Sequence, residues 1–271
     1  MPQIPTKAYS NFNDWFSNLY NSFLSGQKTH PILSQAILYS GIGGKYVRAK
    51  LCFAIGEILE INHVSIIPLA IALESIHAYS LIHDDLPAID NDDYRRGKFS
   101  CHKQFNEATA VLAGDALQSL AYQSICMSDT LSHAQITACL QELVTISGVQ
   151  GMIYGQMLDL FPQDRSKEEQ TYCHELKTAM LFNGCATLPL CLLDLRSPSL
   201  IKNSLVSFTK TFGLFYQTLD DFEDNASSDL IQEVEIQYGQ VSEAYYQIGK
   251  NNSLIDSILA ELHNKITCHR R

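Results

Sequence analysis

Two clusters of aspartate are the residues in this chain whose type and spacing most clearly predict chemistry. The first cluster comprises Asp84, Asp85, Asp90, Asp92 and Asp93. The second comprises Asp220, Asp221 and Asp224, with Glu223 between them. Each cluster follows a run of apolar residues with helical spacing, so each is expected at a helix C-terminus. Carboxylates at the negative end of a helix dipole are destabilised by about 0.3–1 kcal/mol each. A hard cation with oxygen ligands, Mg²⁺, is the natural compensation.

Proline sets the end of the first helix. Pro87 cannot lie inside a helix, and it pushes the preceding residue out of the α region, so the helix is predicted to end near Asp85 or Leu86.

Asp220 and Asp224 are four residues apart and therefore share one helical face. A single Asp–Asp pair is equally well explained as a solvated surface. Two clusters, each after an apolar helix, favour metal binding.

Mg²⁺ held by one or two carboxylates completes its coordination with water and substrate phosphates, so two clusters predict a diphosphate bound from both sides. Such a ligand also needs cationic donors. Arg95 and Arg96 directly follow the first cluster. Lys45 and Arg48 follow the turn at Gly43-Gly44, and Lys177 precedes Thr178. His77 lies seven residues before Asp84 and on the same helical face, where it is either a ligand or a core histidine.

The elements that must position these residues are helices. Apolar residues recur at helical spacing in segments 31–60, 64–85, 104–128, 132–159, 167–192, 199–224 and 229–265. Strand-like alternation is absent, and the breaks between segments are short. We therefore predict one all-α domain over residues 1–271. The most apolar stretch, residues 64–82, contains Glu74 and His77, which favours a buried core helix over a membrane span.

Composition restricts the class of protein. The chain has 271 residues, 46% of them hydrophobic, and a net charge of -10, which disfavours binding to nucleic acid or anionic lipid. Its eight cysteines form no Cys-x-x-Cys pair, so they are expected to be reduced, mostly buried thiols of a cytoplasmic protein rather than zinc ligands or disulfides.

Together these residues resemble the trans-polyprenyl diphosphate synthases, most closely the bacterial farnesyl diphosphate synthases, over about residues 30 to 225. The matching segments are Glu74–Asp90, Asp92–Gly97, Val111–Leu117, Gly151–Asp159, His174–Thr178 and Tyr216–Asp224. The first and last look like the two aspartate-rich motifs of that family. The resemblance implies a bundle of about ten or more helices around a central substrate cavity, of the isoprenoid synthase type. It also implies a homodimer.

The resemblance assigns roles to individual residues. The implied Mg²⁺ ligands, for three ions bound with the substrate diphosphate, are Asp84, Asp85, Asp90, Asp220, Asp221 and Asp224. The implied isopentenyl diphosphate ligands are Lys45, Arg48, His77 and Arg96. The implied allylic diphosphate ligands are Arg95, Lys177, Thr178 and Gln217, of which Lys177, Thr178 and Gln217 are also the implied catalytic residues. Chain length is expected to be set by Tyr79, although Ser80 shares the face of Asp84 more closely.

The implied reaction is that of a (2E,6E)-farnesyl diphosphate synthase, a geranyltranstransferase. Mg²⁺ assists ionisation of dimethylallyl or geranyl diphosphate to a carbocation, which isopentenyl diphosphate attacks. A dry helical cavity protects the cation from water.

The chain departs from the family pattern in three places. Tyr46 and Ala49 replace an arginine and a proline of the Gly-Gly-Lys motif, residues 225–249 contain no lysine, and the C-terminus is short. Alternatives to an active synthase are a weakly active paralogue or non-catalytic partner subunit, and a terpene cyclase. A partner subunit would be expected to lose aspartates, and a cyclase would not need Lys45, Arg48 and Arg96.

Overall fold

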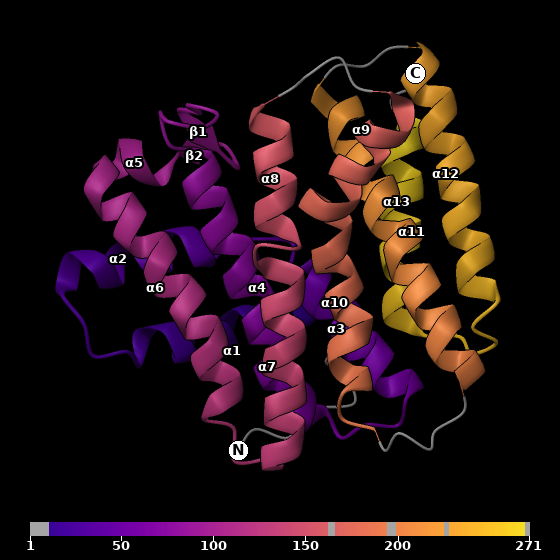
Figure 1. Ribbon diagram of the computed structural model, residues 1–271, viewed down its shortest axis with the longest axis horizontal. Coiled ribbons are helices and arrows are strands. Elements are labelled where there is room, and N and C mark those ends of the chain that lie inside the picture. Colours follow the sequence, from indigo (N-terminus) through magenta and orange to yellow (C-terminus); the bar gives the residue numbers. More distant parts are fainter. Residues whose placement is uncertain (1–10, 162–165, 194–198, 225–227, 269–271) are drawn as a thin grey trace. The chain divides into compact units, whose positions relative to one another are not determined.

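The computed structural model describes residues 11–161, 166–193, 199–224 and 228–268, and these are helical almost throughout (Figure 1). The all-α prediction, with more than ten helices, is confirmed. The described residues contain one small sheet, an antiparallel pair of two-residue strands.

The chain divides into two compact units, each considered by itself. Unit 1 comprises Met1–Ala49 and Ile67–Asp129, and unit 2 comprises Lys50–Ile66 and Thr130–Arg271. The prediction of a single domain over residues 1–271 stays a prediction.

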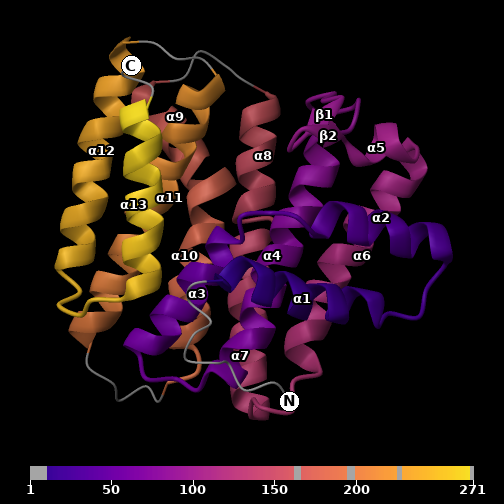
Figure 2. The same cartoon turned by 180° about the vertical axis from the view of Figure 1, so that it is seen from behind.

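Unit 1 carries the first aspartate cluster. Its elements are α1 (Phe12–Ser25), α2 (Pro31–Gly41), most of α4 (His63–Asp84), β1 (Tyr94–Arg95), β2 (Lys98–Phe99), α5 (Cys101–Gln104) and α6 (Glu107–Cys126). Helix α2 packs against α1 and α6, and Figure 2 shows α1 and α2 side by side. Pro31 at the first turn starts α2, and the Asn106 side chain caps α6 by accepting from the Thr109 amide. Neither α1 nor the hairpin is predicted from the sequence pattern.

Unit 2 carries the second cluster. Its elements are most of α3 (Val47–Ile58), α7 (His133–Ser147), α8 (Met152–Leu160), α9 (Lys167–His174), the π-helical turn η2 (Glu175–Ala179), α10 (Met180–Leu190), α11 (Ser199–Asp224), α12 (Ser228–Tyr246) and α13 (Ser253–Cys268). Helices α10, α11, α12 and α13 pack in sequence order (Figure 1). Capping boxes at Ser132 and Ser166 start α7 and α9. The segment predicted as 132–159 is divided by the turn at Gly148–Gly151, where glycines interrupt the helix.

Aromatic residues form the core of unit 2. Phe208, Phe212, Phe215 and Phe222 recur at helical spacing along α11 and are almost fully buried. Burial of one such side chain contributes about 1.5–3 kcal/mol, so this stripe holds α11 against its neighbours. All eight cysteines lie in described residues and are free thiols, five of them buried, as expected.

Among the described residues, two helical stretches are long and apolar enough to cross a membrane by length and composition alone: His63–Asp84, which is α4, and His133–Leu160, which runs over α7, the turn at Gly148–Gly151 and α8. The most apolar window of the first is 72% buried, which is the property of a core helix. The second is 33% buried. One or two such helices are weak evidence for a span, and the expectation of none stays a prediction.

Candidate active site

The first aspartate cluster begins where α4 ends. Asp84 is the last residue of the helix, in agreement with the prediction from Pro87. The chain then turns back, and the Asp90 amide donates a hydrogen bond to the Asp84 carbonyl at 2.9 Å. This bond holds the two residues at one turn, with Asp84 half-buried and Asp90 exposed. The turn thus places two carboxylate-bearing residues together at the negative end of α4.

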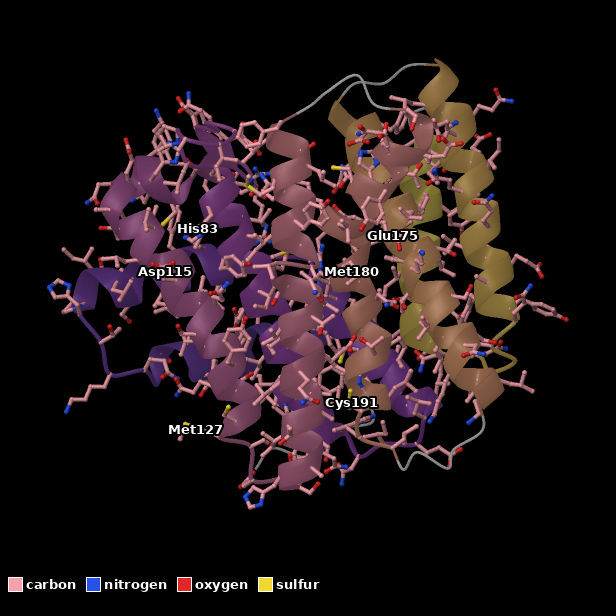
Figure 3. All side chains as sticks on the ribbon, in the orientation of Figure 1. His83, Asp115, Met127, Glu175, Met180 and Cys191 are labelled. Carbon is pink, nitrogen blue, oxygen red and sulfur yellow. The ribbon has the colours of Figure 1, made fainter. Side chains whose placement is uncertain are left out.

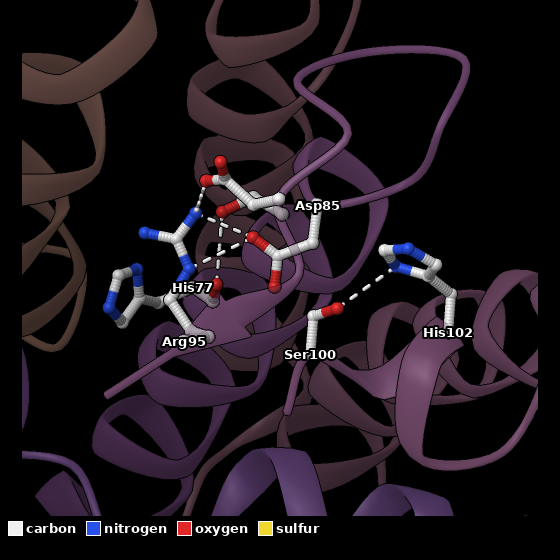
Figure 4. Close-up of polar contacts among 7 residues, drawn as sticks. His77, Asp85, Arg95, Ser100 and His102 are labelled. Atoms are coloured by element: carbon white, nitrogen blue, oxygen red, sulfur yellow. Dashed lines mark hydrogen bonds and ion pairs between the residues drawn. The ribbon is translucent and has the colours of Figure 1, made fainter. Parts of the chain in front are cut away.

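Asp85 is engaged by Arg95. Its Oδ1 accepts hydrogen bonds from Arg95 Nε at 2.9 Å and Nη2 at 2.5 Å, while Nη2 also donates to Asp92 at 2.9 Å (Figure 4). Asp85 is only 2% exposed. Burial raises the pKa of Asp85, and the Arg95 guanidinium opposes that rise. The contacts therefore give Asp85 a visible role in orienting Arg95, in addition to the metal role that the resemblance implies.

Three of the four predicted isopentenyl diphosphate ligands lie near one another: His77 on α4, and Arg48 and Arg96, whose charges act on it. Burial, followed by the positive charges of Arg48, Arg96 and Arg95, holds the pKa of His77 well below its ordinary value. The imidazole is therefore neutral at pH 7, as a hydrogen-bond partner rather than a cation. The fourth ligand, Lys45, is exposed just before α3.

Glycine 44 lets Arg96 approach this region closely. A Cβ at Gly44 would lie 3.2 Å from both terminal nitrogens of the Arg96 guanidinium. A larger residue would shift the guanidinium by a few tenths of an ångström, so Gly44, unlike Gly43, leaves room for the Arg96 side chain.

The departures at Tyr46 and Ala49 have structural explanations. Tyr46 is buried against Phe16, with ring centroids 5.1 Å apart, and its hydroxyl accepts from the Gly43 amide at 3.0 Å. The Ala49 amide donates to the buried Glu74 carboxylate at 3.0 Å. Proline has no amide hydrogen, so alanine gains a bond that a proline could not make. Burial raises the pKa of Glu74, and this amide opposes the rise.

In unit 2 the predicted catalytic residues lie on η2 and α11. Lys177 forms an ion pair with Asp159 of α8. Thr178 Oγ1 donates to Gln217 Oε1 at 2.6 Å, and Gln217 Nε2 donates to Asp221 Oδ1 at 2.8 Å. This chain of hydrogen bonds fixes the orientation of the Gln217 amide. The sequence did not single out Asp159 as a partner of Lys177, although Asp159 is the last residue of the matching segment Gly151–Asp159.

The second aspartate cluster lies at the end of α11. Asp220 is exposed and Asp221 is half-buried. Asp224 is the last residue of the helix, and its side chain lies outside the described residues, as do residues 225–227 of the lysine-free segment. The predicted metal role of Asp224 is therefore not described by these contacts.

The two chain-length candidates occupy different environments on α4. Tyr79 is 6% exposed, and burial raises its pKa to about 12. Its ring packs edge-on against His83, at 5.7 Å between centroids. His83 Nε2 lies 3.1 Å from the Val111 carbonyl and 3.9 Å from Asp115 of α6 (Figure 3). Ser80 is half-buried and donates back to the His77 carbonyl. Tyr79 is thus the bulky buried group.

The donors of the first cluster fit Mg²⁺ bound together with a substrate. Among the described residues, no group of three His, Cys, Asp or Glu side chains is placed to hold a metal ion. Mg²⁺, however, commonly uses one or two carboxylates and fills its remaining positions with water and phosphate oxygens. The pair Asp84 and Asp90 meets that requirement, and hard oxygen donors are the right type.

Comparisons with known proteins agree with these features. A family model described as polyprenyl synthetase matches residues 30–233. Farnesyl diphosphate synthase from Haemophilus influenzae is 40% identical over 212 residues, which are 75% of this chain and 72% of the relative. The enzyme of the same name from Micrococcus luteus is 42% identical over 216 residues, 77% and 72% of the two chains. Geranylgeranyl pyrophosphate synthase 7 from Arabidopsis thaliana is 34% identical, covering 86% and 70%.

Solved structures with the same fold cover almost the whole chain. Geranyltransferase from Legionella pneumophila has a TM-score of 0.87 at 32% identity, covering 96% of this chain and 98% of that one. An FPP/GFPP synthase from Zymomonas mobilis has a TM-score of 0.82 at 27% identity, covering 95% and 98%. A geranyltransferase from Helicobacter pylori, complexed with magnesium and isoprenyl diphosphate, has a TM-score of 0.78 and covers 98% and 99%. Its 24% identity is evidence for the fold alone.

Proposed function

Because this chain belongs to the polyprenyl synthetase family, we propose that it joins isopentenyl diphosphate to dimethylallyl or geranyl diphosphate and releases farnesyl diphosphate. Prenyl transfer is the activity named for its relatives at about 40% identity. The product length is the finer part of the proposal, since a geranylgeranyl pyrophosphate synthase is also among the relatives.

The observation that carries the proposal is the arrangement at the end of α4. Asp84 and Asp90 are drawn together by a backbone hydrogen bond, and Arg95 is oriented beside them by Asp85 and Asp92. Carboxylates for a divalent cation next to an oriented guanidinium form a site suited to a diphosphate.

Substrate binding follows from the cations. Arg95 would hold the allylic diphosphate, while Lys45, Arg48, His77 and Arg96 would hold isopentenyl diphosphate. A neutral His77 can bind a diphosphate oxygen through a ring N–H. Mg²⁺, bound by Asp84, Asp85, Asp90, Asp220, Asp221 and Asp224 as three ions with the diphosphate, would supply positive charge at the leaving group.

By the family resemblance, Lys177, Thr178 and Gln217 would hold the allylic diphosphate. The hydrogen bonds from Thr178 to Gln217 and from Gln217 to Asp221 keep the Thr178 and Gln217 side chains in one orientation before substrate binds. Groups oriented in advance stabilise developing charge without reorganising during the reaction. Loss of the allylic diphosphate leaves a carbocation, and the double bond of isopentenyl diphosphate attacks it to form a new C–C bond and a second carbocation. A proton then passes from this cation to the released diphosphate, which restores a double bond. Apolar helix faces exclude water from the cation.

Tyr79 supports the fifteen-carbon product. It is a large, buried side chain on α4, five residues before Asp84, or about 7.5 Å along the helix axis. Because Ser80 lies closer to the helical face of Asp84 than Tyr79 does, the assignment of Tyr79 as the chain stop rests on the family resemblance together with the size and burial of its ring.

Incubation of the purified chain with isopentenyl and dimethylallyl diphosphates and Mg²⁺, followed by chromatography of the dephosphorylated products, tests the proposal. Farnesol is the expected product. A twenty-carbon alcohol would refute the assigned chain length, a cyclic hydrocarbon would indicate a cyclase, and no product would indicate a weakly active or non-catalytic paralogue. Both aspartate motifs are retained, which disfavours the last outcome. A homodimer and a cytoplasmic location remain part of the proposal, the first testable by light scattering.

A further inference from the structure

The two arginines after the first aspartate cluster are held by a short hairpin. Strands β1 and β2 pair Tyr94 with Phe99 and Arg95 with Lys98, leaving a two-residue turn of Arg96 and Gly97. Both turn residues have positive φ, 54° and 74°. Two-residue turns of this kind match the twist of the strands, and glycine at the second position removes the steric cost there. Arg96 therefore occupies a turn position whose location depends on the whole hairpin.

The two arginines differ in how their side chains are fixed. Arg95 makes charged hydrogen bonds with Asp85 and Asp92. Arg96 makes no hydrogen bond or ion pair with any other residue in the described part of the chain. Its guanidinium only lies against Gly44. The position of Arg96 is thus set by its backbone, and movement of the hairpin would move it directly.

Tyr39 of α2 holds the hairpin through the two residues of β2, Lys98 and Phe99. Its hydroxyl donates to the Phe99 carbonyl at 2.7 Å. In the other direction, Lys98 Nζ donates to the Tyr39 carbonyl at 2.5 Å and lies 3.9 Å from the centroid of the Tyr39 ring. The Tyr39 ring also packs edge-on against Phe105, at 5.6 Å between centroids. One tyrosine therefore holds β2 through a hydrogen bond, a charged hydrogen bond and a cation–π contact.

The Lys98 ammonium is placed there at a cost. Burial, and then the positive charge of Arg96, lower the pKa of Lys98. A lysine that only increased solubility would extend into water instead. The hydrogen bond to the Tyr39 carbonyl and the cation–π contact with the Tyr39 ring offset that cost, which indicates that the attachment of β2 to α2 is a built feature of unit 1.

We propose that Tyr39 and Lys98 are positioning residues for isopentenyl diphosphate, which hold the hairpin so that Arg96 stays at its site. The inference rests on the proposed function for the identity of the ligand. Neither residue touches the substrate. Because Arg95 keeps its own carboxylate partners, loosening the hairpin should weaken binding of isopentenyl diphosphate more than binding of the allylic substrate.

The test compares Tyr39→Phe with Tyr94→Phe. Both variants remove one hydroxyl without changing the charge, but Tyr94 is 63% exposed on the same hairpin and its ring only stacks on Phe99. Loss of one hydrogen bond should raise the KM for isopentenyl diphosphate about three- to ten-fold in Tyr39→Phe, with kcat and the allylic KM within about two-fold. Tyr94→Phe should match wild type. Lys98→Met should repeat the pattern, with Lys28→Met as the charge control because Lys28 is an exposed lysine that follows α1.

Hydrogen exchange measures the attachment without catalysis. The amides of residues 94–100 should exchange faster in Tyr39→Phe than in wild type or Tyr94→Phe, while those of α6 stay unchanged. An unchanged exchange rate, equal rises in both KM values, or faster exchange with an unchanged isopentenyl KM would each refute the positioning role. If wild type makes no prenyl diphosphate, the proposed function fails, and the exchange comparison still decides whether Tyr39 holds the hairpin.

Discussion

Gly155 lies at the closest approach between α8 and the π-helical turn that carries Lys177 and Thr178. A Cβ on Gly155 would lie 2.3 Å from the Lys177 amide nitrogen and 2.6 Å from its Cα. Both are backbone atoms, so no flexible side chain can move aside. We therefore expect Gly155→Ala to displace η2 and with it the two predicted catalytic side chains.

The size of the effect follows from the contact distances. Ordinary contact begins at 3.4 Å. A methyl group at 2.3 Å thus forces α8 and η2 apart by about 1 Å, and overpacking of this kind costs about 1–3 kcal/mol. A displacement of about 1 Å at a catalytic group can lower the rate by about 10²-fold. For a chain of this size the melting temperature should fall by about 2–10 °C.

The assay measures kcat for prenyl transfer well below the melting temperature of the variant, with circular dichroism to confirm the helical fold. Gly239→Ala is the matched control, because a Cβ there meets nothing within 4 Å and Gly239 is exposed on α12. This control should keep full activity and gain about 0.5–1 kcal/mol of stability from the helix propensity of alanine. A Gly155→Ala variant that folds and retains kcat within about three-fold of wild type would refute the argument that this contact positions η2.

Three further outcomes are expected. Asp84→Ala should lower kcat by about 10²–10³-fold and raise the Mg²⁺ concentration needed for half-maximal rate, with the melting temperature little changed; near-normal turnover would contradict the metal assignment. Tyr79→Ala should lengthen the product beyond fifteen carbons, as seen by chromatography, and an unchanged product would exclude Tyr79 as the chain stop. Because the folded protein depresses the pKa of His77, this residue contributes stability above its ordinary pKa of 6.5, and the contribution is lost as the pH falls below it. The free energy of unfolding should therefore fall between pH 6.5 and 5 more steeply in wild type than in His77→Gln, by up to about 1.4 kcal/mol per pH unit, and equal slopes would contradict this.

The sequence predicts the helices well because the signals for them are local. Apolar spacing and Pro87 together predict an end of α4 near Asp85 or Leu86, within two residues of the observed end at Asp84, and the periodicity of residues 199–224 coincides with α11. The same reasoning fails where the signals are weak or short. It misses the break at Gly148–Gly151 and the hairpin around Gly97, because both depend on a few turn residues inside or beside helical patterns.

The aspartate clusters and the cations next to them are likewise readable from the sequence, since a helix end is defined within a few residues. Which partner each side chain takes is decided by the folded geometry, both within the turn that follows a helix and between segments far apart in the chain. Asp85 is engaged by Arg95, and Thr178 by Gln217, 39 residues later. The π-helical register of residues 175–179 and the hold of Tyr39 on β2 also arise only in the folded protein. Local spacing sets which residues share a helix face, whereas burial and the geometry of neighbouring backbones decide which hydrogen bonds those residues form.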